Sequence, residues 1–239
     1  MAELNSVSII IPVYNEEHTV EQIINTVSAL NPKEIIIVDD GSTDGTREIL
    51  EKLKISAEGG SASGEKNKKL KIIYHDKNQG KGSAIRTALK HMTGEIVAIQ
   101  DADLEYNPEE LKKLVIPIID KKTDVVYGSR FFQKPVKNIY KRYKLGNWFL
   151  SKLISVLCSQ KITDSYTCYK VFNTDVIKSI ELESKRFEFE AEITVKLLKK
   201  GIKILELPID YNPRRLGEGK KIGWLDAIKG ILTIVKYSV

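Results

Sequence analysis

The chain has 239 residues and a formal net charge of +6 at pH 7, which is typical of a protein with an anionic partner, such as a nucleotide, a nucleic acid or a lipid surface, but also of a protein whose charge only keeps it soluble. Hydrophobic residues make up 42% of it and charged residues 29%, a globular balance that excludes a disordered or fibrous protein. Its two cysteines and three histidines are not spaced as in a zinc site, and two cysteines do not indicate a disulfide framework. Both observations favour a reducing, cytoplasmic setting.

The first 130 residues alternate short apolar runs with helical patterns. Strands are predicted at residues 7–12, 35–38, 70–74, 95–99 and 124–128. Between them, apolar residues recur at helical spacing, for example from Val20 to Leu30. Strands that alternate with helices predict right-handed βαβ units, and hence an α/β fold with a mainly parallel sheet and helices on both faces.

Polar motifs follow four of the predicted strands. They occupy residues 12–14, 39–40, 79–81 and 101–103. Parallel sheets bind ligands at the carboxyl ends of their strands, so we expect the four motifs to share one site.

The motif Asp101-Ala102-Asp103 carries two carboxylates one residue apart. Alternate residues of an extended chain point the same way, so Asp101, Asp103 and Glu105 are expected to converge. Carboxylates that meet at one point repel one another unless a cation lies between them. Their oxygen atoms are hard ligands, which suit Mg²⁺ or Mn²⁺. The alternative is an ordinary surface turn, where Asp-x-Asp also occurs.

The remaining segments are less regular. Residues 54–69 are polar and of low complexity, which predicts a mobile surface loop. Residues 134–144 are basic and aromatic, and they precede an amphipathic helix at 145–157 that suits either a membrane interface or the core. Beyond the uninformative stretch 163–172, the pattern predicts a helix at 188–200, a strand at 202–209 and an amphipathic helix at 223–237. No signal peptide and no run of 18 apolar residues is present, so no transmembrane segment is expected.

Five motifs together resemble family 2 glycosyltransferases of the GT-A fold, a Rossmann-like nucleotide-binding fold. They are residues 10–16, 38–46, 78–82, 101–103 and 128–130, in that order. Within the family, the chain is most similar to the dolichol-phosphate mannose synthase group, which makes polyprenyl-phosphate sugars. The resemblance implies a single glycosyltransferase domain over residues 1–215. Residues 216–239 would add a basic loop and an amphipathic helix.

The resemblance also implies roles for individual residues. The residues expected to bind the nucleotide-sugar donor are Pro12, Tyr14, Glu16, Val38, Asp39, Asp40, Lys81, Asp101, Ala102, Asp103, Arg130 and Arg214. Either Asp39 or Asp40 would hold the base or ribose. Asp101 and Asp103 would coordinate the divalent metal, with Glu105 as a further candidate ligand. Cations that would contact phosphate groups are Arg130 and one of Arg214, Arg215, Lys220 and Lys221.

The expected chemistry is the departure of a nucleoside diphosphate, whose growing charge a metal and cations stabilise. A lipid phosphate is already an anion at pH 7, because the second pKa of a phosphate monoester is about 6, so it needs no general base. A hydroxyl acceptor would need one, and Asp164 is then the first candidate, unless it is only a turn or cap residue. The expected catalytic residues are thus Asp103, Arg130 and Asp164.

The favoured function is an inverting glycosyltransferase that moves a sugar from GDP-mannose or a UDP-hexose to a polyprenyl or dolichyl phosphate. The protein would sit peripherally on the cytoplasmic face of a membrane. One alternative is transfer to a saccharide or protein hydroxyl. Another is a sugar-nucleotide-binding protein without turnover, although a binder gains little from a metal placed on a leaving group. No nucleic-acid-binding motif is present, so no nucleic-acid partner is expected.

Overall fold

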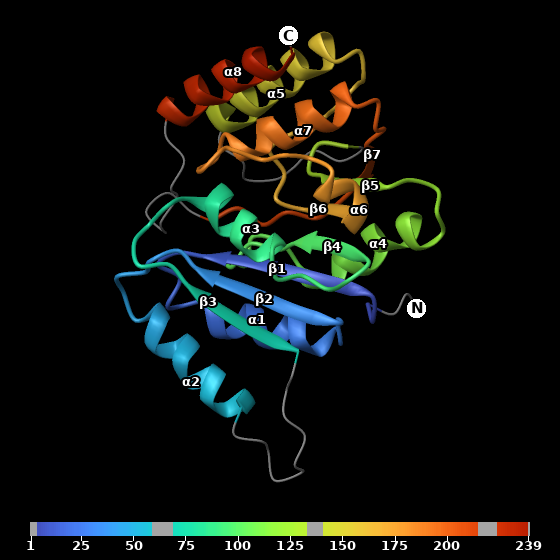
Figure 1. Cartoon of the computed structure of the whole chain (residues 1–239). Coiled ribbons are helices and arrows are strands. Elements are labelled where there is room, and N and C mark those ends of the chain that lie inside the picture. The colour runs from blue at the N-terminus through green and yellow to red at the C-terminus, as the bar shows by residue number, and fades with distance from the viewer. Residues whose placement is uncertain (1–3, 59–68, 133–140, 215–223, 239) are drawn as a thin grey trace.

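The computed structural model describes residues 4–58, 69–132, 141–214 and 224–238. Seven strands form one sheet between two layers of helices (Figure 1). The strands are β1 (Val7–Val13), β2 (Glu34–Asp39), β3 (Leu70–Tyr74), β4 (Ile96–Ile99), β5 (Val125–Ser129), β6 (Lys170–Asn173) and β7 (Leu205–Pro208). Their order is β3-β2-β1-β4-β6-β5-β7, and every pair is parallel except the two that involve β6. The predicted α/β fold with a mainly parallel sheet is confirmed.

Helices cover both faces of this sheet. They are α1 (Val20–Ala29), α2 (Thr46–Glu58), α3 (Lys81–Leu89), η1 (Pro108–Glu110), α4 (Leu111–Ile119), α5 (Lys141–Leu157), α6 (Thr174–Lys178), α7 (Phe189–Lys199) and α8 (Trp224–Ser238). One buried cluster joins α1, α2 and α4 to the sheet, and a second joins α3, α5, α6, α7 and α8 to the opposite face.

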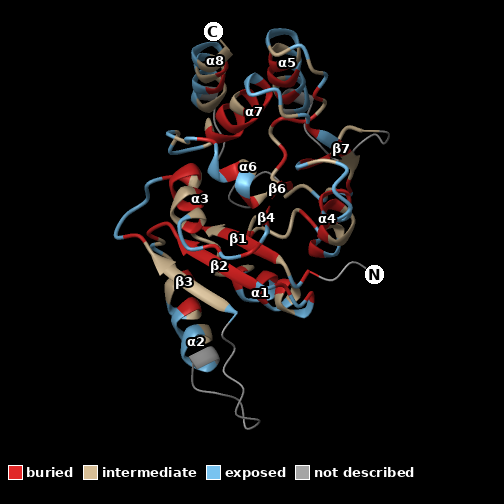
Figure 2. Cartoon of the chain, turned by 45° about the vertical axis from the view of Figure 1, so that its right-hand side comes forward, coloured by how far each residue is buried: buried red, intermediate tan, exposed pale blue. Residues whose placement is uncertain are grey.

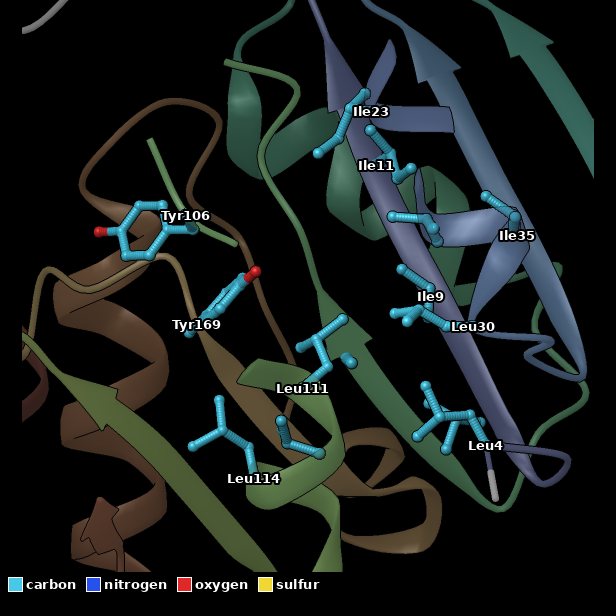
Figure 3. Close-up of a cluster of buried hydrophobic side chains, with 14 of the residues drawn as sticks. Leu4, Ile9, Ile11, Ile23, Leu30, Ile35, Tyr106, Leu111, Leu114 and Tyr169 are labelled. Carbon is cyan, nitrogen blue, oxygen red and sulfur yellow. The ribbon is translucent and has the colours of Figure 1, made fainter. Parts of the chain in front are cut away.

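The central strand β1 shows why its sequence is a continuous apolar run. Ile9 and Ile11 pack in the first cluster, which Figure 3 shows from close by, while Ile10 packs in the second. Successive side chains of a strand point to opposite faces, and here both faces are covered (Figure 2). The strand therefore has no solvent-exposed face, and its polar residue Ser8 is buried and donates a hydrogen bond to Glu34.

Strand β6 is the element that the sequence pattern did not predict. It lies between β4 and β5 and is antiparallel to both, with Val171 opposite Ala98 and Val126. It is four residues long and begins with Lys170, whose charged side chain is fully buried. Four residues that begin with a charged one are too few to show the pattern of apolar residues from which a strand is predicted.

Some helices and strands begin or end at other residues than predicted. Within the predicted loop at 54–69, α2 continues to Glu58 and β3 begins at Leu70, while residues 59–68 lie outside the described chain. The basic segment 134–140 and the cations Arg215, Lys220 and Lys221 also lie outside it. Of the predicted strand at 202–209, only β7 forms. In the described ranges, no helix has the length and apolarity needed to cross a membrane.

Candidate active site

A cavity of about 1010 Å³ opens where β1, β2 and β4 end. Eleven of the residues expected from the sequence line it: Pro12, Tyr14, Glu16, Asp40, Lys81, Asp101, Ala102, Asp103, Glu105, Arg130 and Arg214. Three others do not reach its wall. Val38 packs in the second hydrophobic cluster, and Asp39 and Asp164 are fully buried beside the cavity.

The two adjacent aspartates at the end of β2 accept hydrogen bonds from different parts of the chain. Asp39 accepts hydrogen bonds from Arg47 Nε (2.9 Å) and from the Ser42 amide (3.1 Å). Asp40 accepts from the amides of Gln79 (2.9 Å) and Gly80 (2.7 Å). Of the two, only Asp40 lines the cavity, where it fixes the glycine turn that leads into α3.

Glycine is required at position 80. Its φ is +100°, and a Cβ there would lie 2.4 Å from the carbonyl oxygen of Lys185. This turn places Lys81, the first residue of α3, inside the cavity.

Lys81 is the centre of a buried charge network. Its Nζ lies 2.9 Å from Asp101 Oδ1, 3.0 Å from Glu190 Oε1 and 3.3 Å from Cys168 Sγ. The Cys168 thiol donates to Asp101, and Lys170 pairs with Glu190 from the other side. Burial alone would lower the pKa of Lys81, but the negative groups around it, Asp101 foremost, raise that pKa well above its usual value. The lysine therefore stays charged.

The pKa values of the two carboxylates of the Asp-x-Asp motif are shifted in opposite directions. Burial alone would raise the pKa of Asp101, but Lys81 and its other donors lower it, so Asp101 is ionised. Burial, followed by repulsion from Asp101 and Glu105, raises the pKa of Asp103 to about 7. A cation beside Asp103 would remove that repulsion, so this pair of hard oxygen donors fits a divalent metal.

Glu105 does not follow the expected alternation. The chain turns at Leu104, which has a φ of +59°, so the motif is not extended. Glu105 instead accepts hydrogen bonds from the Tyr211 hydroxyl (2.6 Å) and the Arg214 amide (2.8 Å). In the described part of the chain, three or more acidic, imidazole or thiol groups nowhere form a ready-made metal cluster. The three carboxylates thus do not lie along one extended strand, and Glu105 stays a candidate ligand beside Asp101 and Asp103.

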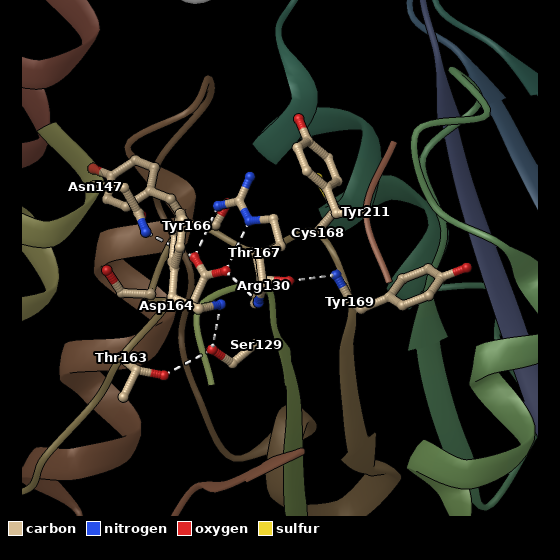
Figure 4. A network of polar contacts seen from close by, with 12 residues as sticks. Ser129, Arg130, Asn147, Thr163, Asp164, Tyr166, Thr167, Cys168, Tyr169 and Tyr211 are labelled. Carbon is tan, nitrogen blue, oxygen red and sulfur yellow. Dashed lines mark hydrogen bonds and ion pairs between the residues drawn. The ribbon is translucent and has the colours of Figure 1, made fainter. Parts of the chain in front are cut away.

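Arg130 and Asp164 form a bidentate ion pair (Figure 4). Arg130 Nε lies 2.7 Å from Asp164 Oδ2, and Nη2 lies 2.8 Å from Oδ1. Asn147 also donates to Oδ1 (3.0 Å), and the Arg130 amide donates to Oδ2 (3.0 Å). Both oxygens of Asp164 are therefore engaged, an arrangement that orients Arg130 rather than freeing a base. Arg130 Nη1 makes no hydrogen bond within the described residues, and the side chain lines the cavity.

Arg214 joins distant parts of the cavity wall. Its Nη2 lies 2.5 Å from Glu16 Oε2, and its Nε donates to the carbonyl oxygen of Asp103 (3.0 Å). Two residues that were expected to contact the donor separately thus contact each other.

Sequence reasoning missed several residues of the site. Glu190, Cys168, Lys170 and Tyr211 belong to no motif, yet they hold the charges of Lys81, Asp101 and Glu105 in place. Cys168 lies 87 positions from Lys81 in the chain, and no local pattern signals such a contact.

Comparison with known proteins agrees with this geometry. The family model described as glycosyl transferase family 2 matches residues 8–181. A UDP-N-acetylglucosamine–dolichyl-phosphate N-acetylglucosaminyltransferase from Methanococcus voltae is 33% identical over 209 residues, which cover 84% of this chain and 83% of that protein. A dolichol-phosphate mannosyltransferase from Pyrococcus furiosus is 31% identical over 232 residues, covering 91% of this chain and 59% of the relative.

Among solved structures, the glucosyl-3-phosphoglycerate synthase from Mycobacterium tuberculosis, in complex with Mn²⁺, UDP and glucosyl-3-phosphoglycerate, superposes with a TM-score of 0.73. It is 18% identical, and the match covers 98% of this chain and 80% of that one. This likeness supports the fold alone. From the family model and the relatives together, the chain belongs to glycosyl transferase family 2 and is a glycosyltransferase with a GT-A fold.

Proposed function

We propose that this glycosyltransferase moves a sugar from a nucleoside-diphosphate sugar to a polyprenyl phosphate at a membrane surface. The observation that carries the proposal is the continuity of the cavity, which runs from the Asp-x-Asp motif to two helices with exposed apolar faces. The curated relatives described above, both of which are named for dolichyl phosphate acceptors, support the same acceptor class.

The acceptor end of the cavity lies under α5 and α8. Gly146, Asn147 and Leu150 of α5 line it, together with Asp226 and Ala227 of α8. The two helices lie side by side in Figures 1 and 2, and Leu150, Ile154 and Ile234 pack in one cluster. They also approach closely, since a Cβ at Gly230 of α8 would lie 3.8 Å from Leu150 Cδ1 of α5. A lipid held against these helices would have its phosphate at the cavity mouth.

The outer surfaces of both helices carry exposed apolar side chains. On α5 these are Leu145, Trp148, Phe149, Val156 and Leu157, and on α8 they are Leu225, Ile228, Leu232 and Val235. Their spacing places most of each set on one face of its helix. Trp148 is 58% exposed and Leu232 is 65% exposed, while Lys144, Lys152 and Lys229 are exposed nearby. Apolar faces with adjacent lysines suit the surface of an anionic bilayer.

The charged groups of the cavity suit the transfer chemistry. A divalent metal held by Asp101 and Asp103 would act as a Lewis acid on the donor diphosphate. Lys81 holds Asp101 ionised, and Arg130 offers Nη1 to an anion while Asp164 fixes its orientation. Asp164, the base expected for a hydroxyl acceptor, has both oxygens engaged by donors, which favours an acceptor that is already an anion.

In this proposal residues 1–215 form the glycosyltransferase domain, and the segment 216–239 supplies α8 as part of the membrane-facing surface. The protein would then act peripherally, on the cytoplasmic face of the membrane. Ile234 of α8 packs in the second core cluster, so the helix is built onto the domain rather than linked loosely to it.

A product assay tests the proposal. Purified protein, Mg²⁺ or Mn²⁺ and a panel of UDP- and GDP-sugars would be incubated with a short polyprenyl phosphate, the matching polyprenol or a free saccharide. We expect organic-extractable sugar only with the phosphate, and only when metal is present. Transfer to the polyprenol or the saccharide alone would refute the acceptor assignment.

Asp103→Asn tests the metal assignment in the same assay. We expect it to lower transfer by at least about 10²-fold, because removing one metal ligand weakens stabilisation of the leaving diphosphate. The matched control is Asp120→Asn, which changes a 43% exposed carboxylate paired with Lys122 and should leave the rate unchanged. An active Asp103 variant would rule out the assigned metal ligand.

A further inference from the structure

One buried histidine has no part in the chemistry described so far. His75 directly follows β3, at the carboxyl end of the strand next to β2, and its side chain is only 8% exposed. Its ring Nδ1 lies 2.7 Å from Asp40 Oδ1, and its Nε2 lies 2.9 Å from the Thr87 hydroxyl of α3. Both ring nitrogens are therefore engaged, one by a carboxylate that lines the active-site cavity and one by a helix.

The contact with Asp40 determines where the ring carries a proton. A carboxylate only accepts hydrogen bonds, so Nδ1 is the donor. The Thr87 hydroxyl can donate to Nε2 or accept from it, and this second contact sets the orientation of the ring. The contacts thus run from α3 through the ring to Asp40. Neither His75 nor Thr87 lines the cavity, so the ring acts on it only through the carboxylate.

The bond from His75 also decides which oxygen of Asp40 has capacity left. Oδ1 accepts from His75 and from the amide of Gln79 (2.9 Å). Among the described residues, Oδ2 accepts only from the amide of Gly80 (2.7 Å). Each carboxylate oxygen can accept about two hydrogen bonds, so Oδ2 is the oxygen that can take one more.

The backbone of His75 is held separately from its side chain. Its amide donates to the Asp39 carbonyl oxygen (2.9 Å), and its own carbonyl oxygen accepts from Arg47 Nη2 (2.8 Å). These bonds remain when the side chain is replaced. A substitution of the ring therefore tests its contacts with Asp40 and Thr87 rather than the path of the backbone.

We propose that His75 is a positioning residue for the nucleoside of the sugar-nucleotide donor. Its Nδ1–H holds the Asp40 carboxylate so that Oδ2 accepts a hydrogen bond from a hydroxyl or an N–H group of the nucleoside. The diphosphate oxygens are acceptors and gain nothing from a carboxylate, so the effect of His75 is confined to the nucleoside. This inference rests on the nucleoside-diphosphate donor of the proposed function.

Two variants at one position separate the two contacts of the ring. The amide nitrogen of an asparagine can take the place of Nδ1, whereas that of a glutamine reaches the place of Nε2. We expect His75→Gln to weaken the binding of UDP or GDP by about tenfold, through the loss of one hydrogen bond to a charged group. His75→Asn loses only the contact with Thr87 and should keep the affinity within about threefold. His91→Gln, at an exposed histidine just beyond α3, is the matched control and should bind as the unmodified protein does.

Isothermal titration calorimetry of the full chain with Mg²⁺ supplies these affinities. Inorganic pyrophosphate, which offers a diphosphate without a nucleoside, should bind equally to the unmodified protein and to both His75 variants. A general loss of structure would weaken both ligands together. In the glycolipid assay, the donor KM of His75→Gln should rise by about tenfold while kcat stays within about twofold, because the lost contact serves binding rather than the chemical step.

The possible outcomes separate this inference from the proposed function. UDP or GDP affinity that is unchanged in His75→Gln, or a parallel loss of pyrophosphate affinity, would overturn the role of His75 and leave the donor assignment in place. An unmodified protein that binds neither UDP nor GDP would refute the donor itself, and this inference with it. NMR of the ring nitrogens tests the hydrogen bond without any variant: we expect a proton on Nδ1 of His75, and a ring protonated at Nε2 alone would overturn the proposal.

Discussion

Replacing Asp164 by asparagine removes a buried negative charge while leaving the size of the side chain almost unchanged. In the structure this carboxylate accepts three hydrogen bonds from Arg130 and one from Asn147. An asparagine keeps one acceptor oxygen and turns an NH₂ group toward donors. The change thus leaves the guanidinium of Arg130 buried with an incomplete partner.

The expected cost follows from that geometry. Breaking a buried ion pair by neutralising one partner destabilises a protein by about 3–5 kcal/mol. For a chain of this length, each kcal/mol lowers Tm by about 2–4 °C, so we expect Tm to fall by about 6–20 °C. The control Asp120→Asn disrupts an exposed pair worth about 0–1 kcal/mol and should lower Tm by less than about 4 °C.

The same variant separates positioning from base catalysis. If Asp164 only orients Arg130, the rate of transfer to polyprenyl phosphate, measured well below Tm, should fall by only about tenfold, and its pH profile should not change. The loss is limited because Arg130 keeps its hydrogen bond to the Tyr166 carbonyl oxygen. A general base contributes about 10²–10⁴-fold and leaves its own pKa in the pH profile.

Thermal unfolding by circular dichroism and a glycolipid assay between pH 5 and 9 supply both readouts. A Tm within about 2 °C of that of the unmodified protein would refute the stabilising ion pair. A rate loss beyond about 10³-fold, with a flattened pH profile, would refute the positioning role.

Three further changes probe other parts of the structure. Gly80→Ala should lower Tm by several degrees, because it forces a Cβ against the Lys185 carbonyl at a φ of +100°; an unchanged melting curve would contradict this. Trp148→Ser should reduce sedimentation with anionic vesicles several-fold, whereas Ile116→Ser, at an exposed position of α4, should not; equal losses would argue against docking through α5. Burial alone would raise the pKa of Glu34, but hydrogen bonds from lysine, serine and threonine side chains lower it from 4.5 to about 2. Its stabilising contribution should therefore be complete above pH 4.5 and lost as the pH falls to about 2, so the Tm difference from Glu34→Gln should vanish there.

The sequence was most informative where physical constraints are local. A strand buried on both faces must be a continuous apolar run, so β1, β2 and β4 could be placed from their residues. Ligands collect at the carboxyl ends of parallel strands, and Asp40, Lys81 and Asp101 do line one cavity there.

The sequence was least informative where tertiary contacts decide. The Asp-x-Asp motif was treated as extended, but the left-handed turn at Leu104 directs Glu105 to Tyr211 and Arg214. Asp164 was predicted to be a general base or a turn or cap residue, because nothing near it in the chain shows that Arg130 occupies both its oxygens. Such pairings depend on how segments far apart in the chain meet, and no local period encodes them.

The position of β6 has a consequence for how such a protein can diversify. The chain leaves the sheet at the end of β5 and returns on the neighbouring strand, where Tyr127 pairs with Lys170. All residues between these strands, including Asn147, Asp164 and Cys168, thus form one excursion whose two ends are adjacent. Insertions within the excursion leave the strand register untouched, because entry and exit are already fixed by a ladder. The part of the cavity wall that α5 supplies can therefore change in length or sequence without shifting β5 and β6.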